Sequence, residues 1–148
     1  IPETNMQMNN MMGESFLLPD GFHSWQENVR LNSMMTPTMV LDGEGKFCYA
    51  GGSGGAGRIP FMIAQVIKTL FDEGLNLDSA TKKPRVHVQE DLLHFEKGAL
   101  LTPHSFEKIK EWDYKSLFFG GVHSVFQGKK GNLQASGDAR RYGVAEVF

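Results

Sequence analysis

The chain has 148 residues, of which 41% are hydrophobic and 22% charged, and this composition is typical of one globular unit with a single core. Its formal net charge of −2 provides no basic surface for a phosphate backbone, which argues against nucleic acid as a partner. The single Cys48 excludes an internal disulfide framework, and no apolar run is long enough to cross a bilayer. We therefore treat residues 1–148 as one structural unit.

The first third of the chain predicts irregular structure followed by a hairpin. The methionine-rich start partly alternates and predicts a half-buried strand up to Met12. The segment Ser15–Arg30 contains turn residues and predicts an ordered loop. Strand-like runs at Met35–Leu41 and Lys46–Ala50 flank Asp42-Gly43-Glu44-Gly45, a strong β-hairpin signal.

Two helices are predicted in the middle of the chain. From Ile59 to Phe71, apolar residues recur with the spacing of one helical face. Pro60 suits the first turn of this helix, and Gly74 suits its C-terminal cap. A shorter helix is predicted over Leu77–Lys82, and it should end before Pro84.

The second half of the chain is predicted to be rich in strands. Its one predicted helix runs from Pro103 to Trp112, with Thr102 as the N-terminal cap. Near the C-terminus, Asp138 is expected to form an ion pair with Arg140 or Arg141. Because hairpins join most neighbouring strands, we predict an α+β fold with largely antiparallel sheets. The predicted strands are Arg85–Val88, Leu92–Glu96, Leu117–Phe119, Val122–Gln127 and Asn132–Ser136.

A glycine pattern precedes the first helix. Gly52, Gly54 and Gly57 spell G-x-G-x-x-G, as in a dinucleotide-binding turn. That turn needs a parallel strand pair and an acidic residue at the end of the second strand, about twenty residues further along the chain. The acidic residue near that position is Asp78, which lies in a segment with a helical pattern. A Walker loop fails because Arg58-Ile59 stands in place of Lys and Ser or Thr. The remaining interpretation is a loop whose backbone N–H groups stabilise a negative charge, such as an oxyanion.

Histidines near the middle of the chain could indicate a metal site. His87, Glu90 and His94 are close in sequence, but the residues around His87 alternate like a strand and no fourth ligand is evident. We therefore favour structural roles for these histidines. We favour the same role for His123, which lies between a glycine-rich and an apolar segment.

Several motifs, spaced along nearly the whole chain and in the same order, resemble the γ-glutamyltransferase (γ-glutamyl transpeptidase) family of the N-terminal-nucleophile hydrolases. They are MNNMMGE, RLNSMMTPT, GSGGAGRI, DEGLNLDSATKKPRVH, FGGVHSV and ASGDARR, and they correspond to the C-terminal part of the small catalytic subunit. The resemblance implies an αββα sandwich, of which this chain would form part. It also implies a precursor, or zymogen, that cleaves itself by autoproteolysis.

The resemblance further implies an acyl-transfer enzyme of glutathione metabolism. Such an enzyme cleaves γ-glutamyl amide bonds and passes the acyl group to water or to an amino acid. The nucleophile would be a new N-terminal Thr upstream of Asn9, outside this chain, with its own amine as base. No cofactor and no metal are implied. The implied partners are the large subunit, or upstream segment of the same precursor, and a small γ-glutamyl substrate, and a homo-oligomer is left open.

By the same resemblance, the paired glycines that form the oxyanion hole fall on Gly55 and Ala56. Alanine retains the N–H group, so the role survives if the local φ and ψ suit a residue with a Cβ. Acyl transfer is therefore better supported by the sequence than the identity of the acyl group.

The substrate-binding positions of the family are only partly retained. The two serines that bind the α-carboxylate fall on Ser33 and Met34, so one hydroxyl donor is missing. The segment that holds the α-amino group falls on Met11, Gly13 and Glu14, where only Glu14 is charged. Selectivity for glutamate needs both charged groups to be satisfied, so these substitutions question it.

Three hypotheses of different classes remain at this point. The first is part of an acyl-transfer enzyme, either a γ-glutamyltransferase or an amide hydrolase of other acyl specificity. The second is a non-catalytic remnant of the fold, and the third is a nucleotide-binding domain. A Thr-Thr or Thr-Ser start to the mature subunit would separate the first from the second, and titration with nicotinamide cofactors would test the third.

Overall fold

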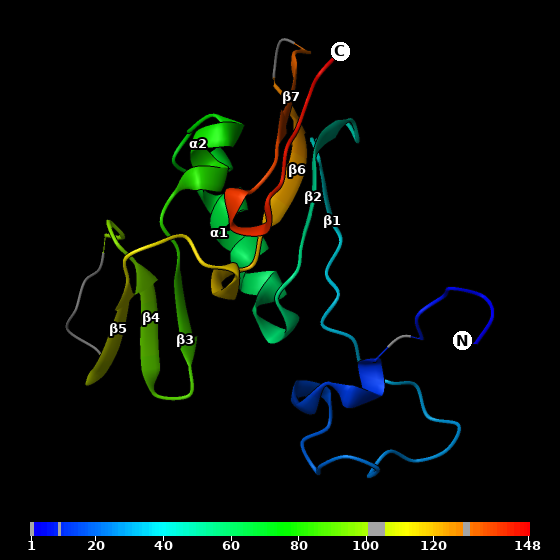
Figure 1. The fold of residues 1–148 in the computed structure, drawn as a ribbon. Coiled ribbons are helices and arrows are strands. Elements are labelled where there is room, and N and C mark those ends of the chain that lie inside the picture. Colours follow the sequence, from blue (N-terminus) through cyan, green and yellow to red (C-terminus); the bar gives the residue numbers. More distant parts are fainter. Residues whose placement is uncertain (1, 9, 101–105, 129–130) are drawn as a thin grey trace.

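A computed structural model describes residues 2–8, 10–100, 106–128 and 131–148. The described residues form two α-helices and two β-sheets (Figure 1). The helices are α1 (Ile59–Phe71) and α2 (Leu77–Lys82). The strands are β1 (Thr38–Leu41), β2 (Phe47–Ser53), β3 (Val86–Gln89), β4 (Leu92–Glu96), β5 (Lys108–Trp112), β6 (Val122–Gln127) and β7 (Leu133–Ser136). None of the helices in the described part is long and apolar enough to span a membrane.

The larger sheet has the strand order β1-β2-β6-β7, and each neighbouring pair is antiparallel. Both helices lie on one side of this sheet (Figure 1). Strand residues that face the helices, such as Tyr49 and Val122, are fully buried against Met62 and Val66 of α1. The core is therefore a single layer of side chains between one sheet face and two helices.

The two helices predicted in the middle of the chain are confirmed with the same bounds. Pro60 lies in the first turn of α1, and Gly74 (φ +69°) follows its end in the left-handed region that favours glycine. Asn76 caps α2, since its side chain accepts a hydrogen bond from the Ser79 N–H at 2.8 Å. Thr69 of α1 is a polar residue outside the apolar spacing that predicts this helix, and it is nevertheless buried.

The smaller sheet corrects one prediction. Strands β3 and β4 form the predicted antiparallel hairpin, but β5 pairs with β4 in parallel, where a helix over Pro103–Trp112 was predicted. The helix prediction is wrong for Lys108–Trp112, because pairing with the open edge of β4 outweighs the weak helical preference of these residues. Thr102 and Pro103 lie outside the described residues.

Two further strand predictions are wrong. Residues Met11–Gly13 form a 3₁₀ turn, and Met6, Met8 and Met12 are exposed instead of lying in a half-buried strand. A strand needs a partner, and within the described ranges none pairs with this segment. Residues Leu117–Phe119 also form a 3₁₀ turn, because the Ser116 side chain caps it and Gly120 (φ +72°) ends it. The loop predicted over Ser15–Arg30 is confirmed after one 3₁₀ turn.

A buried charge network joins the two sheets to the C-terminal segment. Asp138 accepts hydrogen bonds from Arg85 Nη2 at 2.6 Å and from the Val122 N–H at 2.9 Å. Arg140 lies 3.2 Å from Asp138 and also pairs with Glu96 of β4. All four charged side chains are buried. The predicted ion pair is therefore confirmed for Arg140, and Arg85 and Glu96 are partners that the sequence did not indicate.

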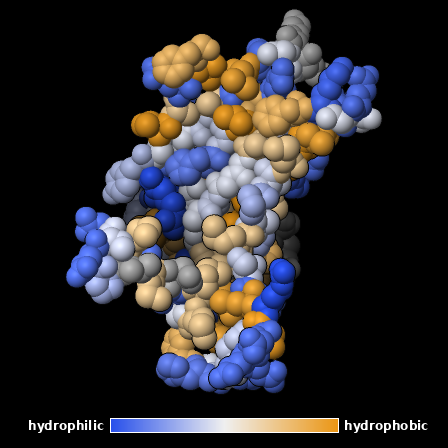
Figure 2. Space-filling model, turned by 90° about the vertical axis from the view of Figure 1, so that its right-hand side faces the viewer, coloured by the Kyte–Doolittle hydropathy of each residue, from blue (hydrophilic) through white to orange (hydrophobic). Residues whose placement is uncertain are grey.

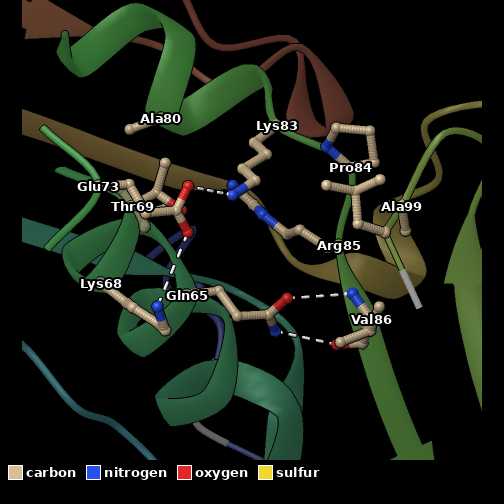
Figure 3. A pocket seen from close by; sticks show the side chains of 12 residues that line it. Gln65, Lys68, Thr69, Glu73, Ala80, Lys83, Pro84, Arg85, Val86 and Ala99 are labelled. Atoms are coloured by element: carbon tan, nitrogen blue, oxygen red, sulfur yellow. Dashed lines mark hydrogen bonds and ion pairs between the residues drawn. The ribbon is translucent and has the colours of Figure 1, made fainter. Parts of the chain in front are cut away.

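Gln65 of α1 links the helix to the smaller sheet. Its side chain bonds to both backbone groups of Val86, donating to the carbonyl oxygen at 2.9 Å and accepting from the N–H at 3.0 Å (Figure 3). The amide of Gln65 thus occupies the place of a neighbouring strand at the free edge of β3.

Replacing Gln65 by Leu is expected to lower the free energy of unfolding by about 1–3 kcal/mol, because two partly buried backbone groups lose their partners. Urea unfolding of the complete protein that contains this chain would measure the change. The control is Gln89→Leu at the exposed end of β3, which should stay within about 0.5 kcal/mol of wild type. Equal costs for both variants would contradict the linking role.

Candidate functional site

The glycine pattern lies where β2 passes into α1. Gly52 belongs to β2, and the chain then crosses Gly54 and Gly55 into a 3₁₀ turn, Ala56–Arg58, that leads into α1. The strand before the loop has only antiparallel neighbours in the described sheet. This arrangement lacks the parallel strand pair of a dinucleotide-binding turn and contradicts the third hypothesis.

The loop is held in place from two sides by the segment before β6. The Ser53 hydroxyl donates to the Gly54 carbonyl at 2.8 Å and accepts from the Gly121 N–H at 3.1 Å. The Arg58 Nε donates to the Phe118 carbonyl at 2.7 Å, and its guanidinium lies 4.6 Å from the centre of the Phe118 ring. These contacts fix the loop backbone before any ligand arrives.

Two backbone N–H groups of this rigid loop remain available. The Gly55 and Ala56 carbonyls accept the N–H groups of Arg58 and Ile59, but the N–H groups of Gly55 and Ala56 find no acceptor among the described residues. Both precede the first turn of α1, where the helix dipole favours negative charge. Adjacent free donors of this kind are suited to a developing oxyanion.

The backbone at Ala56 has the conformation of a glycine. Its φ is +51°, in the left-handed region that costs an L-residue about 1–2 kcal/mol. Ala56 therefore holds its Cβ in this loop only at the cost of strain. Gly55, with φ +131°, adopts a backbone conformation that residues with a side chain rarely take.

Replacing Ala56 by Gly is therefore expected to stabilise the protein by about 0.5–1 kcal/mol, since relief of the strain exceeds the extra entropy of a glycine. A rise in the urea midpoint of the complete protein would show it. The matched control is Ala64→Gly in the exposed middle of α1, where the same change should destabilise by about 1 kcal/mol. Destabilisation by both variants would contradict the strain at residue 56.

The methionine-rich segment lies beside this loop. The Phe16 ring covers Gly57, since a Cβ built there would lie 2.9 Å from the ring carbon Cε2. Met11 and Ala56 both pack against the hydrophobic core, and Glu14, between Met11 and Phe16, is half-buried. The structure thus places the segment with the predicted positions Met11 and Glu14 next to the loop of Gly55 and Ala56.

Ser33 and Met34, the positions that the resemblance assigns to the α-carboxylate, differ in their exposure. The Met34 side chain is buried in the hydrophobic core, so it does not face a ligand in this structure. The Ser33 side chain is exposed, and its Oγ accepts the Met35 N–H at 3.1 Å.

The two histidines of the smaller sheet have structural contacts. His87 and His94 are paired across β3 and β4, and the Trp112 indole donates to His94 Nδ1 at 3.2 Å. Burial lowers the pKa of both imidazoles, and the charges of Arg58 and other basic groups lower it further. A neutral imidazole is the form that accepts the Trp112 bond, which supports a structural role for His94. Within the described ranges no group of three potential ligands could hold a metal ion.

Comparison with known proteins gives consistent matches. The sequence model of the family described as "Gamma-glutamyltranspeptidase" matches residues 2–148. The "Glutathione hydrolase proenzyme" of Escherichia coli K12 is 33% identical over 118 residues, which cover 76% of this chain and 20% of that protein. The protein of the same name from Pseudomonas aeruginosa is 29% identical over 125 residues, 80% of this chain and 22% of its own length. The chain thus spans about a fifth of the length of these relatives.

Solved structures agree with this match. The γ-glutamyltranspeptidase from Pseudomonas nitroreducens in complex with L-DON superimposes with a TM-score of 0.76 at 22% identity, over 100% of this chain and 84% of that chain. A mutant of the γ-glutamyltranspeptidase from Helicobacter pylori gives a TM-score of 0.65 at 28% identity, over 78% of this chain and 66% of that chain. The predicted α+β fold class with largely antiparallel sheets is therefore confirmed.

Proposed function

This chain belongs to the gamma-glutamyltranspeptidase family, and we propose that residues 1–148 form the C-terminal part of the small subunit of an enzyme that cleaves γ-glutamyl amide bonds. The acyl group passes to water or to an amino acid through an N-terminal Thr supplied by another part of the same precursor. That precursor cleaves itself, and this chain provides one wall of the resulting active site.

The observation that carries this proposal is the loop at Gly55 and Ala56. Two adjacent backbone N–H groups are held rigidly at the start of α1 and have no acceptor among the described residues. They would hydrogen-bond the carbonyl oxygen of the scissile amide as it becomes an oxyanion. The loop is anchored through Ser53 and Arg58, so these donors need no rearrangement during the reaction.

The open face of the larger sheet supports a partner from the same precursor. An antiparallel sheet that faces water on one side normally carries polar residues there. Here, β1, β6 and β7 present exposed apolar residues on the face opposite the helices, and Figure 2, which views this side of the molecule, shows hydrophobic residues gathered on it. They are Met39, Leu41, Val125 and Leu133. A second sheet on this face would complete an αββα sandwich.

The proposed acyl group is γ-glutamyl, as in glutathione. Of the positions that the family resemblance assigns to the glutamyl group, Ser33 and Glu14 keep polar side chains, whereas Met11 and Met34 have none. We therefore expect γ-glutamyl compounds to be substrates with a smaller preference over neutral acyl groups than in an enzyme with the full polar set.

The test uses the complete protein that contains this chain. Intact-mass analysis is expected to find two polypeptides after self-cleavage, and the purified protein should release nitroaniline from γ-glutamyl nitroanilide. The same assay with a neutral acyl nitroanilide of similar size measures the preference for the γ-glutamyl group. A single uncleaved polypeptide that releases no nitroaniline would refute the proposal and favour a non-catalytic remnant.

A further inference from the structure

Arg141 lies across two glycines next to the loop. A Cβ at Gly121 would come within 2.6 Å of Arg141 Cγ, and a Cβ at Gly54 within 2.8 Å of Arg141 Cζ. Only residues without side chains let Arg141 cross from the start of β6 to the loop at this distance. Its guanidinium therefore rests on the residue directly before Gly55 and Ala56.

This guanidinium has no counter-charge in the chain. Every Asp and Glu lies among the described residues, and none of them is within ion-pair distance of Arg141 or Arg58. The adjacent Arg140 is the opposite case, because it is buried and paired with Asp138 and Glu96. Of the two adjacent arginines, Arg140 is therefore buried in the core, whereas Arg141 is exposed beside the loop.

Arg58 adds a second positive charge to the same place. Burial lowers the pKa of the Arg58 guanidinium, and the nearby charge of Arg141 lowers it further. The Nε of Arg58 is already bonded to the Phe118 carbonyl, and its side chain is half-buried. Arg58 therefore strengthens the local field, whereas Arg141 is exposed and free to contact a ligand.

We infer that Arg141 binds a carboxylate of the substrate whose carbonyl oxygen lies on the Gly55 and Ala56 N–H groups. A planar guanidinium with a free edge matches a carboxylate with two parallel hydrogen bonds. This inference rests on the proposed function and specifies that the substrate carries a carboxylate. The carboxylate belongs either to the acyl group or to the leaving group, and both have the same chemistry at Arg141. Met34, which stands at a position assigned to that carboxylate, offers no donor and is buried.

The experiment compares wild type with Arg141→Gln and Arg141→Lys in the complete, self-cleaved protein. One substrate pair is γ-glutamyl nitroanilide and its α-carboxamide analogue, which tests a carboxylate on the acyl group. The other pair is γ-glutamyl nitroanilide and its ring-carboxylated form, which tests a carboxylate on the leaving group. The control is Lys108→Gln, which removes an exposed positive charge from the edge strand β5.

If Arg141 binds the carboxylate of the acyl group, Arg141→Gln should raise KM by about 10- to 100-fold for γ-glutamyl nitroanilide and leave the α-carboxamide analogue nearly unchanged. If Arg141 binds a carboxylate of the leaving group, the same increase should appear for the ring-carboxylated substrate and not for the substrate without the ring carboxylate. Arg141→Lys should restore part of this loss, and Lys108→Gln should behave as wild type. If both ratios stay at their wild-type values, the inference is overturned. Unchanged ratios with a loss of stability also overturn it, since Arg141 would then pair with a carboxylate of the protein.

If the wild-type protein turns over none of these substrates, the proposed function fails by itself. Calorimetric titration with glutarate then tests Arg141 independently. Binding by wild type that is lost in Arg141→Gln upholds the carboxylate site, and equal or absent binding in both overturns it.

Discussion

Replacement of Asp138 by Asn in the complete protein is expected to lower the free energy of unfolding by about 3–5 kcal/mol, the cost of breaking a buried ion pair. The side chain is 1% exposed and is the shared acceptor for Arg85 and Arg140. Without its charge, both guanidinium groups stay buried, and the remaining carboxylate, Glu96, bonds to the guanidinium of Arg140 but only to the backbone N–H of Arg85. Urea unfolding, monitored by circular dichroism, measures the change.

A matched control separates this effect from the loss of any surface charge. Asp113 lies 3.5 Å from Lys97 with its side chain 84% exposed, so Asp113→Asn should change stability by about 0–1 kcal/mol. Similar costs for the two substitutions would show that the network is not a stability element.

The same residue predicts a pH dependence. Burial alone would raise the pKa of Asp138, but Arg85 and the N–H groups of Arg140 and Val122 outweigh it and hold the pKa below its usual value of 3.8. A depressed pKa means that the unfolded state binds the proton more readily. The contribution of Asp138 is therefore complete above the usual value and is lost as the pH falls through the lower folded pKa. The Asn variant should lack this part of the acid sensitivity.

Removal of the Ala56 N–H is expected to slow acyl-enzyme formation by about 10²–10³-fold, the usual cost of one oxyanion-hole donor. Proline at residue 56 would be a poor test, because it requires φ near −65° while the backbone here has φ +51°. The α-hydroxy analogue of alanine, introduced at position 56 as a backbone ester, replaces the N–H by oxygen and leaves the side chain unchanged.

The control for this change is an ester at Gly43, in the exposed turn between β1 and β2. It should keep wild-type turnover, and so should Ala56→Gly, which retains the donor. Pre-steady-state nitroaniline release from the mature protein is the measurement, because self-cleavage itself could depend on the loop. If the folded, mature ester at residue 56 reacts at the wild-type rate, the N–H groups of this loop are not the oxyanion donors.

The sequence by itself determined the elements whose signals are local. The period of apolar residues fixed α1 from Ile59 to Phe71, and the turn residues before Lys46 fixed the hairpin of β1 and β2. The family motifs, read in order, identified the fold and placed the loop at Gly55 and Ala56 between a strand and a helix. These features depend on residues close together in the chain, so short windows of sequence contain them.

Only the tertiary structure decided the features that depend on distant partners. Residues Lys108–Trp112 became a strand because β4 offered a free edge, and the methionine-rich start remained irregular because no described strand pairs with it. The sequence places Arg140 and Arg141 side by side, yet one is neutralised in the core and the other rests on Gly54. Glu96 and Gly54, which separate the two roles, lie far away in the sequence. Pairing energies and close approaches of this kind arise from three-dimensional proximity, which no local pattern encodes.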